Sequence, residues 1–532
     1  MRPGRAVFAW ALTLLAAILL RLRMAGIGLL GWDTYPLILT NRAENVGDLV
    51  ALFGARLMQG LYSSEFYRPL VGLSFALDHA LWGLRPAGYL WTSAILFAVC
   101  AAALWRLLRR LAGPGAWIAP LAGLLFFLLH PTQVEILAVP SRRAEMLSGL
   151  FMALALASQL EPRRLASRAI PWRPAGFALL AFLSKETTFT LPAVAFVAVF
   201  LASPLPHSSA RARQAARALI PHAVALAAVL LARVAILGGI GGHATSGVGG
   251  SLARLPSYLG TMFKWSLLPQ EALSGSALAA SLLAAIAAAW LATLLLPGGE
   301  RTGESERPAK SERRLERERR PGGERQPAGD RGRRPQAPAP ASLRMGLGGL
   351  AWLLAVGLAY AIAGEMSPWY MFLPVAGMAI VYGAFAGALA RAVRLARPPA
   401  RWAAALGAAL LATLLVWQAA YSPAFYPYRE WTEGTRVAGE FLEQATAVLA
   451  QAQPGTAVEG PPLPTWVHPR PEEASRPHVY GAAVFAEYTI QAWARLAYPE
   501  RRIRVEIARD MNQAVASPDE VLLVLTRRLP GY

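Results

Sequence analysis

The sequence predicts an all-α, polytopic membrane protein of about eleven transmembrane helices, followed by a small α/β domain at its C-terminal end. Hydrophobic residues make up 55% of the 532-residue chain and charged residues only 16%, which is more apolar surface than soluble domains of this length carry. The charged residues fall in blocks that separate apolar runs of about 15–22 residues. About 20 such residues cross the hydrocarbon core of a bilayer as a helix.

The first apolar run, 6–21, follows a short basic start and is closed by Arg21 and Arg23. It lacks a small-residue cleavage pattern before Arg21, so we interpret it as an uncleaved signal anchor rather than a signal peptide. The remaining spans are expected near residues 88–106, 115–130, 145–159, 174–184, 190–203, 221–239, 275–297, 345–364, 369–390 and 402–420.

Arginine-rich loops predict the orientation of the chain. Every second loop is basic, namely 106–110, 163–173, 211–217, 298–343 and 391–401. The positive-inside rule therefore predicts a cytoplasmic N-terminus and an extracytoplasmic C-terminus. The ambiguous stretch is 174–203, which can form either a hairpin or one interrupted helix, and the charge bias favours the hairpin.

Composition divides the chain into four parts. Residues 1–297 form a transmembrane core with a first outer loop at 22–87, and 344–421 return to transmembrane helices. The intervening stretch 298–343 is rich in Arg, Glu, Pro and Gly, and is predicted to be a disordered, basic cytoplasmic loop.

The last part, 422–532, predicts a small extracytoplasmic α/β domain with no tetratricopeptide period of roughly 34 residues. Apolar periodicity indicates helices at Trp431–Gln451 and Ala486–Tyr498. Strands are expected at His478–Tyr480, Ile503–Ile507 and Val521–Leu525.

Charge and motif content exclude several classes of function. The net charge of +20 does not indicate nucleic-acid binding, because the basic residues follow the loops between apolar runs. The single cysteine, Cys100, lies inside an apolar run and permits no disulfide within the chain. The chain has no Walker loop, dinucleotide glycine fingerprint, His-x-x-His pair or Cys-x-x-Cys pair. No preformed metal site is therefore predicted; a divalent metal cofactor is allowed but not indicated.

Asp33 lies about a dozen residues beyond the first apolar run, between Trp32 and Tyr35. A carboxylate at a membrane surface can take a proton from a hydroxyl group, or hold a metal, beside a lipid-borne substrate. The predicted topology places further polar residues on the same outer side, in four clusters: Arg68, Asp78 and His79; His130, Glu135, Arg143 and Glu145; Lys185 and Glu186; and Glu365, Trp369 and Tyr370.

Each cluster also has a purely structural interpretation. Asp33 can be an exposed loop carboxylate, and Lys185 and Glu186 can form an ion pair that closes a tight hairpin. Trp369 and Tyr370 suit an aromatic belt at the membrane interface. The remaining groups suit snorkelling helix ends (Arg142, Arg143), the polar face of an interfacial amphipathic helix over 70–84 (Asp78, His79) and packing at a helix end (His130).

The motifs Tyr67-Arg68-Pro69-Leu70 and Leu73–Gly83 resemble the first-loop signature of transmembrane O-mannosyltransferase-like proteins. The similarity continues in three places: His130-Pro131 with Val134-Glu135 and Arg143–Ser148, then Leu183–Glu186, then Trp369–Pro374. It covers roughly residues 25–200 and 365–380. Animal members of that family carry tetratricopeptide repeats, which this chain lacks.

The resemblance implies a C-type-fold glycosyltransferase whose catalytic core is 1–297. It further implies a polyprenyl-phosphate-linked sugar as donor at the outer leaflet, and an acidic residue of the first outer loop as general base. Family members carry an acidic pair there, whereas this chain has Asp33-Thr34, so Asp33 is kept as the base and a metal-binding role for the pair is in doubt. The acceptor is an unidentified hydroxyl of a protein or glycan.

We expect Arg143 and Lys185 to bind the donor phosphate. Trp32, Trp369 and Tyr370 are expected to stack on the sugar. Asp33 would then deprotonate the acceptor for an inverting transfer.

Two other classes remain open. A transporter of lipid-linked sugars requires charged groups at mid-membrane depth, and Arg233 is such a group. A membrane scaffold with an outer domain that binds cell-wall material, and with an inactive core, would be consistent with the missing second acid.

Overall fold

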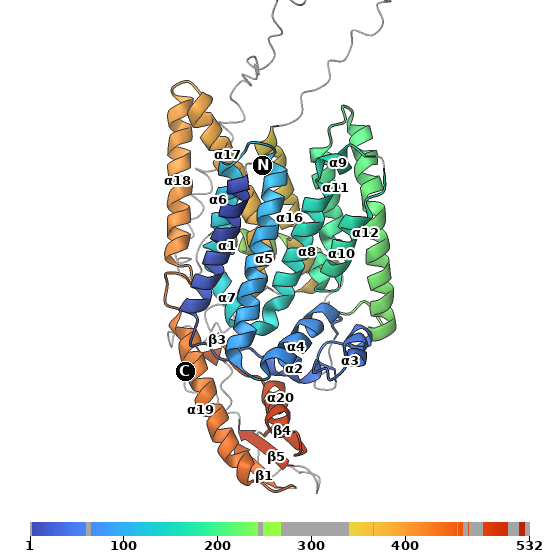
Figure 1. The fold of residues 1–532 in the computed structure, drawn as a ribbon, viewed down its shortest axis with the longest axis vertical. Helices are drawn as coiled ribbons and strands as arrows, with labels where there is room; N and C mark the ends of the chain where they lie inside the picture. Colours follow the sequence, from blue (N-terminus) through green and yellow to red (C-terminus); the bar gives the residue numbers. More distant parts are fainter. Residues whose placement is uncertain are drawn as a thin grey trace, which may run out of the picture.

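The computed structural model describes residues 3–59, 65–167, 169–242, 248–267, 340–364, 366–454, 456–460, 466–467, 482–508 and 521–526. Long helices stand side by side along the long axis of the molecule, and the C-terminal helices and strands lie at one end (Figure 1). The beginning of α1 (Pro3–Arg23) lies at the other end. That the two termini lie on opposite sides of a membrane, and which side is cytoplasmic, stays a prediction.

The bundle is built from α1, α5 (Pro86–Ala112), α6 (Ile118–Leu128), α8 (Arg143–Gln159), α10 (Trp172–Phe182), α11 (Leu191–Ala202), α12 (Ser208–Leu237), α16 (Ala341–Ala363), α17 (Phe372–Leu395) and α18 (Ala400–Ala420). Helix α13 (Val248–Leu267) packs against α16 and α17. Near the C-terminal elements the chain forms short helices and 3-10 turns: α2 (Thr34–Thr40), α3 (Val46–Ala51), η1 (Leu52–Gly54), α4 (Pro69–Trp82), α7 (Gln133–Ala138), η2 (Pro140–Arg142), η3 (Glu186–Thr190) and η5 (Pro368–Met371). The short α9 (Pro162–Leu165) lies at the opposite end.

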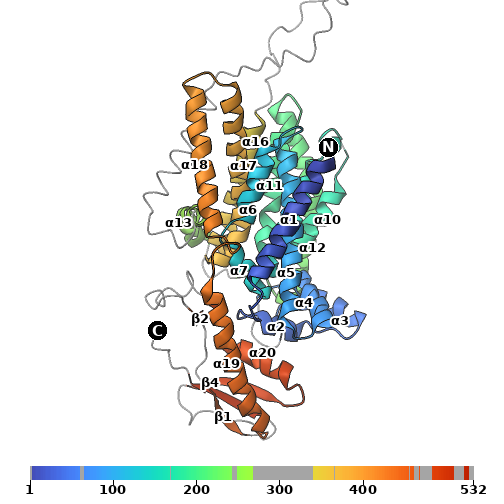
Figure 2. The same ribbon diagram turned by 60° about the vertical axis from the view of Figure 1, so that its left-hand side comes forward.

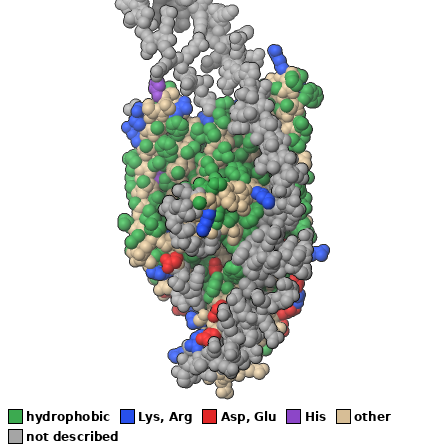
Figure 3. All heavy atoms as spheres, turned by 180° about the vertical axis from the view of Figure 1, so that it is seen from behind, with side chains coloured by type: hydrophobic (Ala, Val, Ile, Leu, Met, Phe, Trp, Pro, Cys, Tyr) green, Lys and Arg blue, Asp and Glu red, His purple; other side chains and the backbone are tan. Residues whose placement is uncertain are grey.

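Five of the described helices are long and apolar enough to cross a membrane: α5, α12, α16, α18, and the continuous stretch of η5 and α17 (Pro368–Leu395). The outward sides of the bundle expose large hydrophobic residues, such as Leu15 on α1, Leu231 on α12 and Trp402 on α18. Between the two ends, Figure 3 shows a surface made mostly of hydrophobic side chains. Water-exposed surfaces rarely carry such continuous apolar area. The chain is therefore an integral, multi-pass membrane protein.

Ten of the eleven predicted spans coincide with described helices. The eleventh, 275–297, lies outside the described residues, as does almost all of the loop 298–343. Because several of these helices are short, the total number of membrane crossings stays a prediction.

Glycines allow α6, α16 and α17 to pack with their backbones almost in contact. A Cβ atom added to Gly123 would lie 2.5 Å from the carbonyl oxygen of Ala379, and one added to Gly383 would lie 2.5 Å from that of Ala119. Small residues at helix interfaces are the usual means of close packing in a membrane. This packing fixes α16 and η5, which form one wall of the site described below.

The stretch 172–202 forms a hairpin, as the charge pattern favoured. Gln214, near the start of α12, donates through Nε2 to the carbonyl oxygen of Leu165 at 2.5 Å and accepts from the hydroxyl of Ser203 at 2.5 Å. Leu165 precedes α10 and Ser203 follows α11, so the two ends of the stretch 172–202 lie close together, both beside the side chain of Gln214. The turn at the far end of the hairpin, which carries Lys185 and Glu186, therefore points toward the opposite end of the bundle.

The C-terminal part contains α19 (Arg429–Gln451) and α20 (Glu487–Ala497), together with β1 (Ala457–Gly460), β4 (Ile503–Ala508) and β5 (Val521–Thr526) in one parallel sheet of order β1-β5-β4 (Figure 2). Ile503 pairs with Val521, and Ala457 pairs with Leu522. A second pairing joins β2 (Trp466–Val467) to β3 (Ala482–Ala483).

Both predicted helices and the strands at 503 and 521 are present, whereas β1, β2 and β3 were not predicted. The predicted strand His478–Tyr480 lies outside the described residues. That these elements form a separate domain on the outer side stays a prediction.

Candidate functional site

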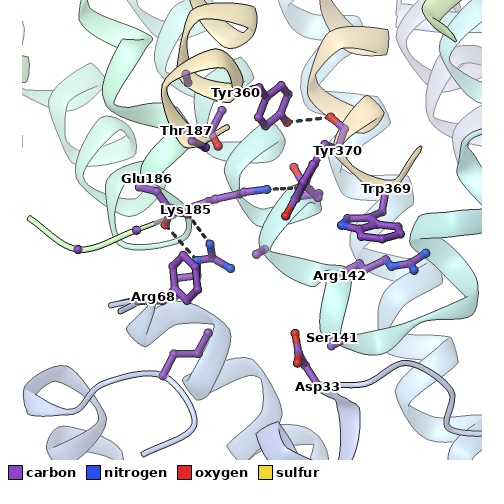
Figure 4. A pocket seen from close by; sticks show the side chains of 18 of the residues that line it. Asp33, Arg68, Ser141, Arg142, Lys185, Glu186, Thr187, Tyr360, Trp369 and Tyr370 are labelled. Atoms are coloured by element: carbon purple, nitrogen blue, oxygen red, sulfur yellow. Dashed lines mark hydrogen bonds and ion pairs between the residues drawn. The ribbon is translucent and has the colours of Figure 1, made fainter. Parts of the chain in front are cut away.

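A cavity of about 490 Å³ lies at the end of the bundle nearest the C-terminal elements. Segments from the whole length of the chain contribute to it (Figure 4). Its charged and aromatic lining consists of Trp32, Asp33, Phe66, Arg68, Arg142, Glu145, Lys185, Glu186, Phe189, Arg233, Tyr360, Trp369, Tyr370 and Tyr488. Clefts of this volume, with apolar walls and a few convergent polar groups, are typical small-molecule sites.

A tight turn places Asp33 at the cavity. Gly31 has a φ of +94°, and a Cβ atom there would lie 2.3 Å from Cγ1 of Val139, so only glycine fits. Thr34 donates its hydroxyl to the carbonyl oxygen of Leu30 at 2.6 Å, which closes the turn. Asp33 precedes α2, yet its side chain makes no capping hydrogen bond; instead Oδ1 accepts from the phenol of Tyr488 at 2.9 Å.

We expect Gly31→Ala to destabilise the fold by about 1–3 kcal/mol, because alanine is strained at this φ and meets Val139. Thermal unfolding of the purified protein would measure the loss. Gly26→Ala is the matched control, since a Cβ at Gly26 meets nothing within 4 Å. Equal unfolding temperatures for the two variants would contradict the role of this turn.

Lys185 reaches into the cavity from the tip of the hairpin. Its ammonium group forms an ion pair with Glu145 of α8 and lies 4.5 Å from the ring centroid of Tyr370. Burial lowers the pKa of Lys185, and the Glu145 carboxylate opposes that shift. Oε2 of Glu145 is buried and has no hydrogen-bond partner in the described part of the chain. The alternative in which Lys185 pairs with Glu186 is wrong, because Glu186 pairs with Arg68 in a bidentate contact.

Arg142 is another charged residue of the cavity lining. It forms an ion pair with Glu135 and lies 4.6 Å from the ring centroid of Trp369. Burial raises the pKa of Glu135, and Arg142 opposes this effect. Trp369 and Tyr370 therefore each lie beside a cation within the cavity, and cation–π contacts hold both rings in place.

Arg233 was not predicted as a site residue, although it lines the cavity. It is fully buried near the end of α12, and donates through Nε to the carbonyl oxygen of Ile240 at 2.7 Å. Among the described residues, no ion pair to Arg233 is found and its Nη2 has no hydrogen-bond partner. Arg68, Arg142 and Lys185 all have carboxylate partners, so Arg233 is the cation of this lining best suited to an added anion.

Arg143, predicted to bind the donor phosphate, does not line the cavity. Its guanidinium is fully buried between the start of α8 and the helices α4 and α5, where it forms an ion pair with Asp78 and donates to the carbonyl oxygen of Tyr89 at 2.7 Å. The phosphate role is therefore corrected, because this guanidinium is enclosed by protein. The same contact overturns the interfacial interpretation of Asp78, which is 2% exposed.

We expect Arg143→Ala to cost about 3–5 kcal/mol of stability, since it leaves the Asp78 carboxylate buried without its cation. Chemical or thermal unfolding measures this loss. The double variant Arg143→Met with Asp78→Leu should be more stable than Arg143→Ala alone, because neither charge remains buried. A normally stable Arg143→Ala with weakened donor binding would restore the phosphate role.

The other predicted residues lie elsewhere. His130 is buried, with Nε2 at 3.2 Å from the carbonyl oxygen of Ser266, in agreement with the packing interpretation. His79 is half-buried on α4. Glu135 does not line the cavity, but it pairs with Arg142, which does. Glu365 lies outside the described residues. Within the residues the structure describes, no group of three or more His, Cys, Asp or Glu side chains is arranged to hold a metal ion.

The fold and the cavity define a multi-pass membrane protein with a charged, aromatic-lined cavity at one end of its helix bundle. No family model matches the chain. Over 94 residues it is 38% identical to Protein O-mannosyl-transferase TMTC2 of Mus musculus, and 37% identical to the TMTC2 proteins of Xenopus laevis and Homo sapiens. The match covers 18% of this chain and 11% of each relative, so the chain spans about a tenth of the curated relatives that it matches.

This similarity agrees with the family resemblance indicated by the motifs. A crystal structure of ArnT from Cupriavidus metallidurans bound to undecaprenyl phosphate aligns with 87% of this chain and 83% of its own, with 13% identity and a TM-score of 0.45.

Proposed function

We propose that this protein is a membrane glycosyltransferase that moves a sugar from a polyprenyl-phosphate donor to a hydroxyl acceptor, with Asp33 as general base. The observation that carries the proposal is the content of one cavity: a carboxylate, an arginine with no ion pair to a described residue, and several aromatic rings. The 94-residue similarity to proteins named as O-mannosyl-transferases supports the same class.

The donor phosphate is assigned to the Arg233 side of the cavity. The buried Nη2 of Arg233 supplies a hydrogen-bond donor, and Lys185 and Arg68 add positive charge close by. A lipid phosphate leaves as a stabilised anion, so its departure needs cations rather than a strong acid. Arg233 thereby replaces Arg143 in the mechanism, while Lys185 keeps its predicted role.

The sugar is assigned to the aromatic wall between the cations and Asp33. Trp369 and Tyr370 line the cavity, and the buried Oε2 of Glu145 can accept a hydrogen bond from a sugar hydroxyl. On the opposite side, Asp33 takes the proton of the acceptor hydroxyl (Figure 4). The acceptor oxygen then attacks the anomeric carbon opposite the phosphate, with inversion.

The charge pattern of the loops supports an extracytoplasmic position for this cavity. The proposal is tested by reconstituting the purified protein in liposomes with a panel of radiolabelled polyprenyl-phosphate sugars and acceptor extracts. We expect label to pass from lipid to acceptor. Movement of labelled lipid across the bilayer without transfer would support a transporter instead, and neither transfer nor movement would support a scaffold.

A further inference from the structure

Among the described residues of the C-terminal part, the segment 482–489 lines the cavity. Three hydrogen bonds join it to three consecutive residues of the first outer loop. The amide of Gly31 donates to the carbonyl oxygen of Ala483 at 3.1 Å, and the hydroxyl of Thr489 donates to the carbonyl oxygen of Trp32. The third bond is that from the Tyr488 phenol to Asp33.

Packing around this segment holds it against the first outer loop. Helix α20 packs on α2, which follows Asp33 directly. The ring of Phe485 lies 6.4 Å from that of Tyr35 and 5.7 Å from that of Phe441 on α19. Ala483 and Tyr488 both line the cavity. The phenol of Tyr488 therefore comes from an ordered, packed element rather than from a loose surface loop.

We propose that Tyr488 is a positioning residue for the general base, so that the C-terminal elements complete the catalytic site. This inference rests on the proposed function, and within it assigns a role to Tyr488. A phenol O–H donated to a carboxylate fixes the orientation of the carboxylate and favours its ionised form, which is the form that accepts the proton. No capping bond restrains the Asp33 side chain, so Tyr488 supplies the restraint that α2 does not.

Other charged groups share the cavity with Asp33. Arg142 is close enough to interact electrostatically with it, and the remaining charged lining consists of Arg68, Glu145, Lys185, Glu186 and Arg233. Removal of the Tyr488 hydroxyl leaves all of these in place. A change in the acid limb of the pH–rate profile therefore reports the loss of the phenol alone.

The test compares Tyr488→Phe with wild type in the liposome transfer assay. We expect kcat to fall about 10- to 100-fold, as for a lost hydrogen bond to a charged group. The KM for the donor should stay unchanged, and the acid limb of the profile should move to higher pH because the carboxylate loses a stabilising donor. Tyr498→Phe is the matched control: it removes the same hydroxyl at the end of α20, where that group contacts the carbonyl oxygen of Thr446 at 3.4 Å, outside the cavity.

A double-mutant cycle separates positioning from general packing. If Tyr488 acts through Asp33, Tyr488→Phe should cause no further loss in an Asp33→Asn background, whereas a structural role gives the same loss in both backgrounds. Wild-type kcat and pH profile in Tyr488→Phe, or additive losses in the cycle, would overturn the inference. A wild-type protein that transfers no sugar overturns the proposed function itself; transfer that needs Asp33 but not Tyr488 overturns this inference alone.

Discussion

Asp33→Asn is expected to reduce sugar transfer by about 10²–10⁴, the usual effect of losing a positioned general base. The substitution preserves size and much of the hydrogen-bonding capacity, including the contact from Tyr488, but an amide cannot accept the acceptor's proton. The measurement is the initial rate of label transfer under saturating donor and acceptor. Donor binding should be unaffected.

Asp48→Asn is the matched control for Asp33→Asn. Asp48 lies in the same loop, 22–87, and its carboxylate accepts hydrogen bonds from the backbone N–H groups of Glu44 and Asn45 at the start of α3, away from the cavity lining. Its variant should turn over at the wild-type rate. Wild-type turnover in Asp33→Asn would return Asp33 to its interpretation as a loop carboxylate.

Arg233→Gln is expected to raise the KM for the donor by about 10- to 100-fold, the effect of losing one charge-assisted hydrogen bond. The guanidinium is buried and has an Nη2 without a partner among the described residues, so a bound phosphate would gain a contact that glutamine cannot replace. Direct binding of an undecaprenyl phosphate to the protein in detergent, without any acceptor, measures the same loss.

Arg56→Gln serves as the control for Arg233→Gln. Arg56 also donates to backbone carbonyl oxygens at the end of α12, those of Ile236 at 3.2 Å and Leu237 at 3.0 Å, but it does not line the cavity. If both variants weaken donor binding equally, the effect comes from the loop around α12 and Arg233 is not a phosphate ligand.

The helical architecture followed from the sequence because apolar length and arginine distribution are local properties of a membrane chain. The same holds for Lys185, Trp369 and Tyr370, which stand at ends of apolar runs, and for Asp33 in the loop after the first run; all four line the cavity. The sequence could not show which of Arg142 and Arg143 lines the cavity. Neighbouring helical positions differ by about 100° around the axis, so one guanidinium enters the cavity and the other is enclosed behind it.

The roles of Tyr488 and Arg233 could be recognised only from the tertiary structure. Tyr488 lies 455 positions from Asp33, and no local pattern connects them. Arg233 did carry a signal, since an ionisable residue inside an apolar span is a functional candidate by default. The sequence could not show how strong this candidate is, because the carboxylates that pair with the other cations of the cavity are identified only in the fold.

The position of Arg233 on an outer helix has a kinetic consequence for the proposed donor. Its neighbours on α12, Leu231 and Val234, are 71% and 49% exposed on the apolar surface of the bundle. A polyprenyl tail can therefore remain dissolved among the lipid chains while its phosphate reaches the guanidinium. Since each methylene moved out of hydrocarbon into water costs about 0.8 kcal/mol, a route within the bilayer avoids a very large barrier. With the proposed activity, the transfer rate should follow the mole fraction of donor in the bilayer, so diluting the vesicles leaves the rate unchanged, whereas diluting the donor with other lipids lowers it.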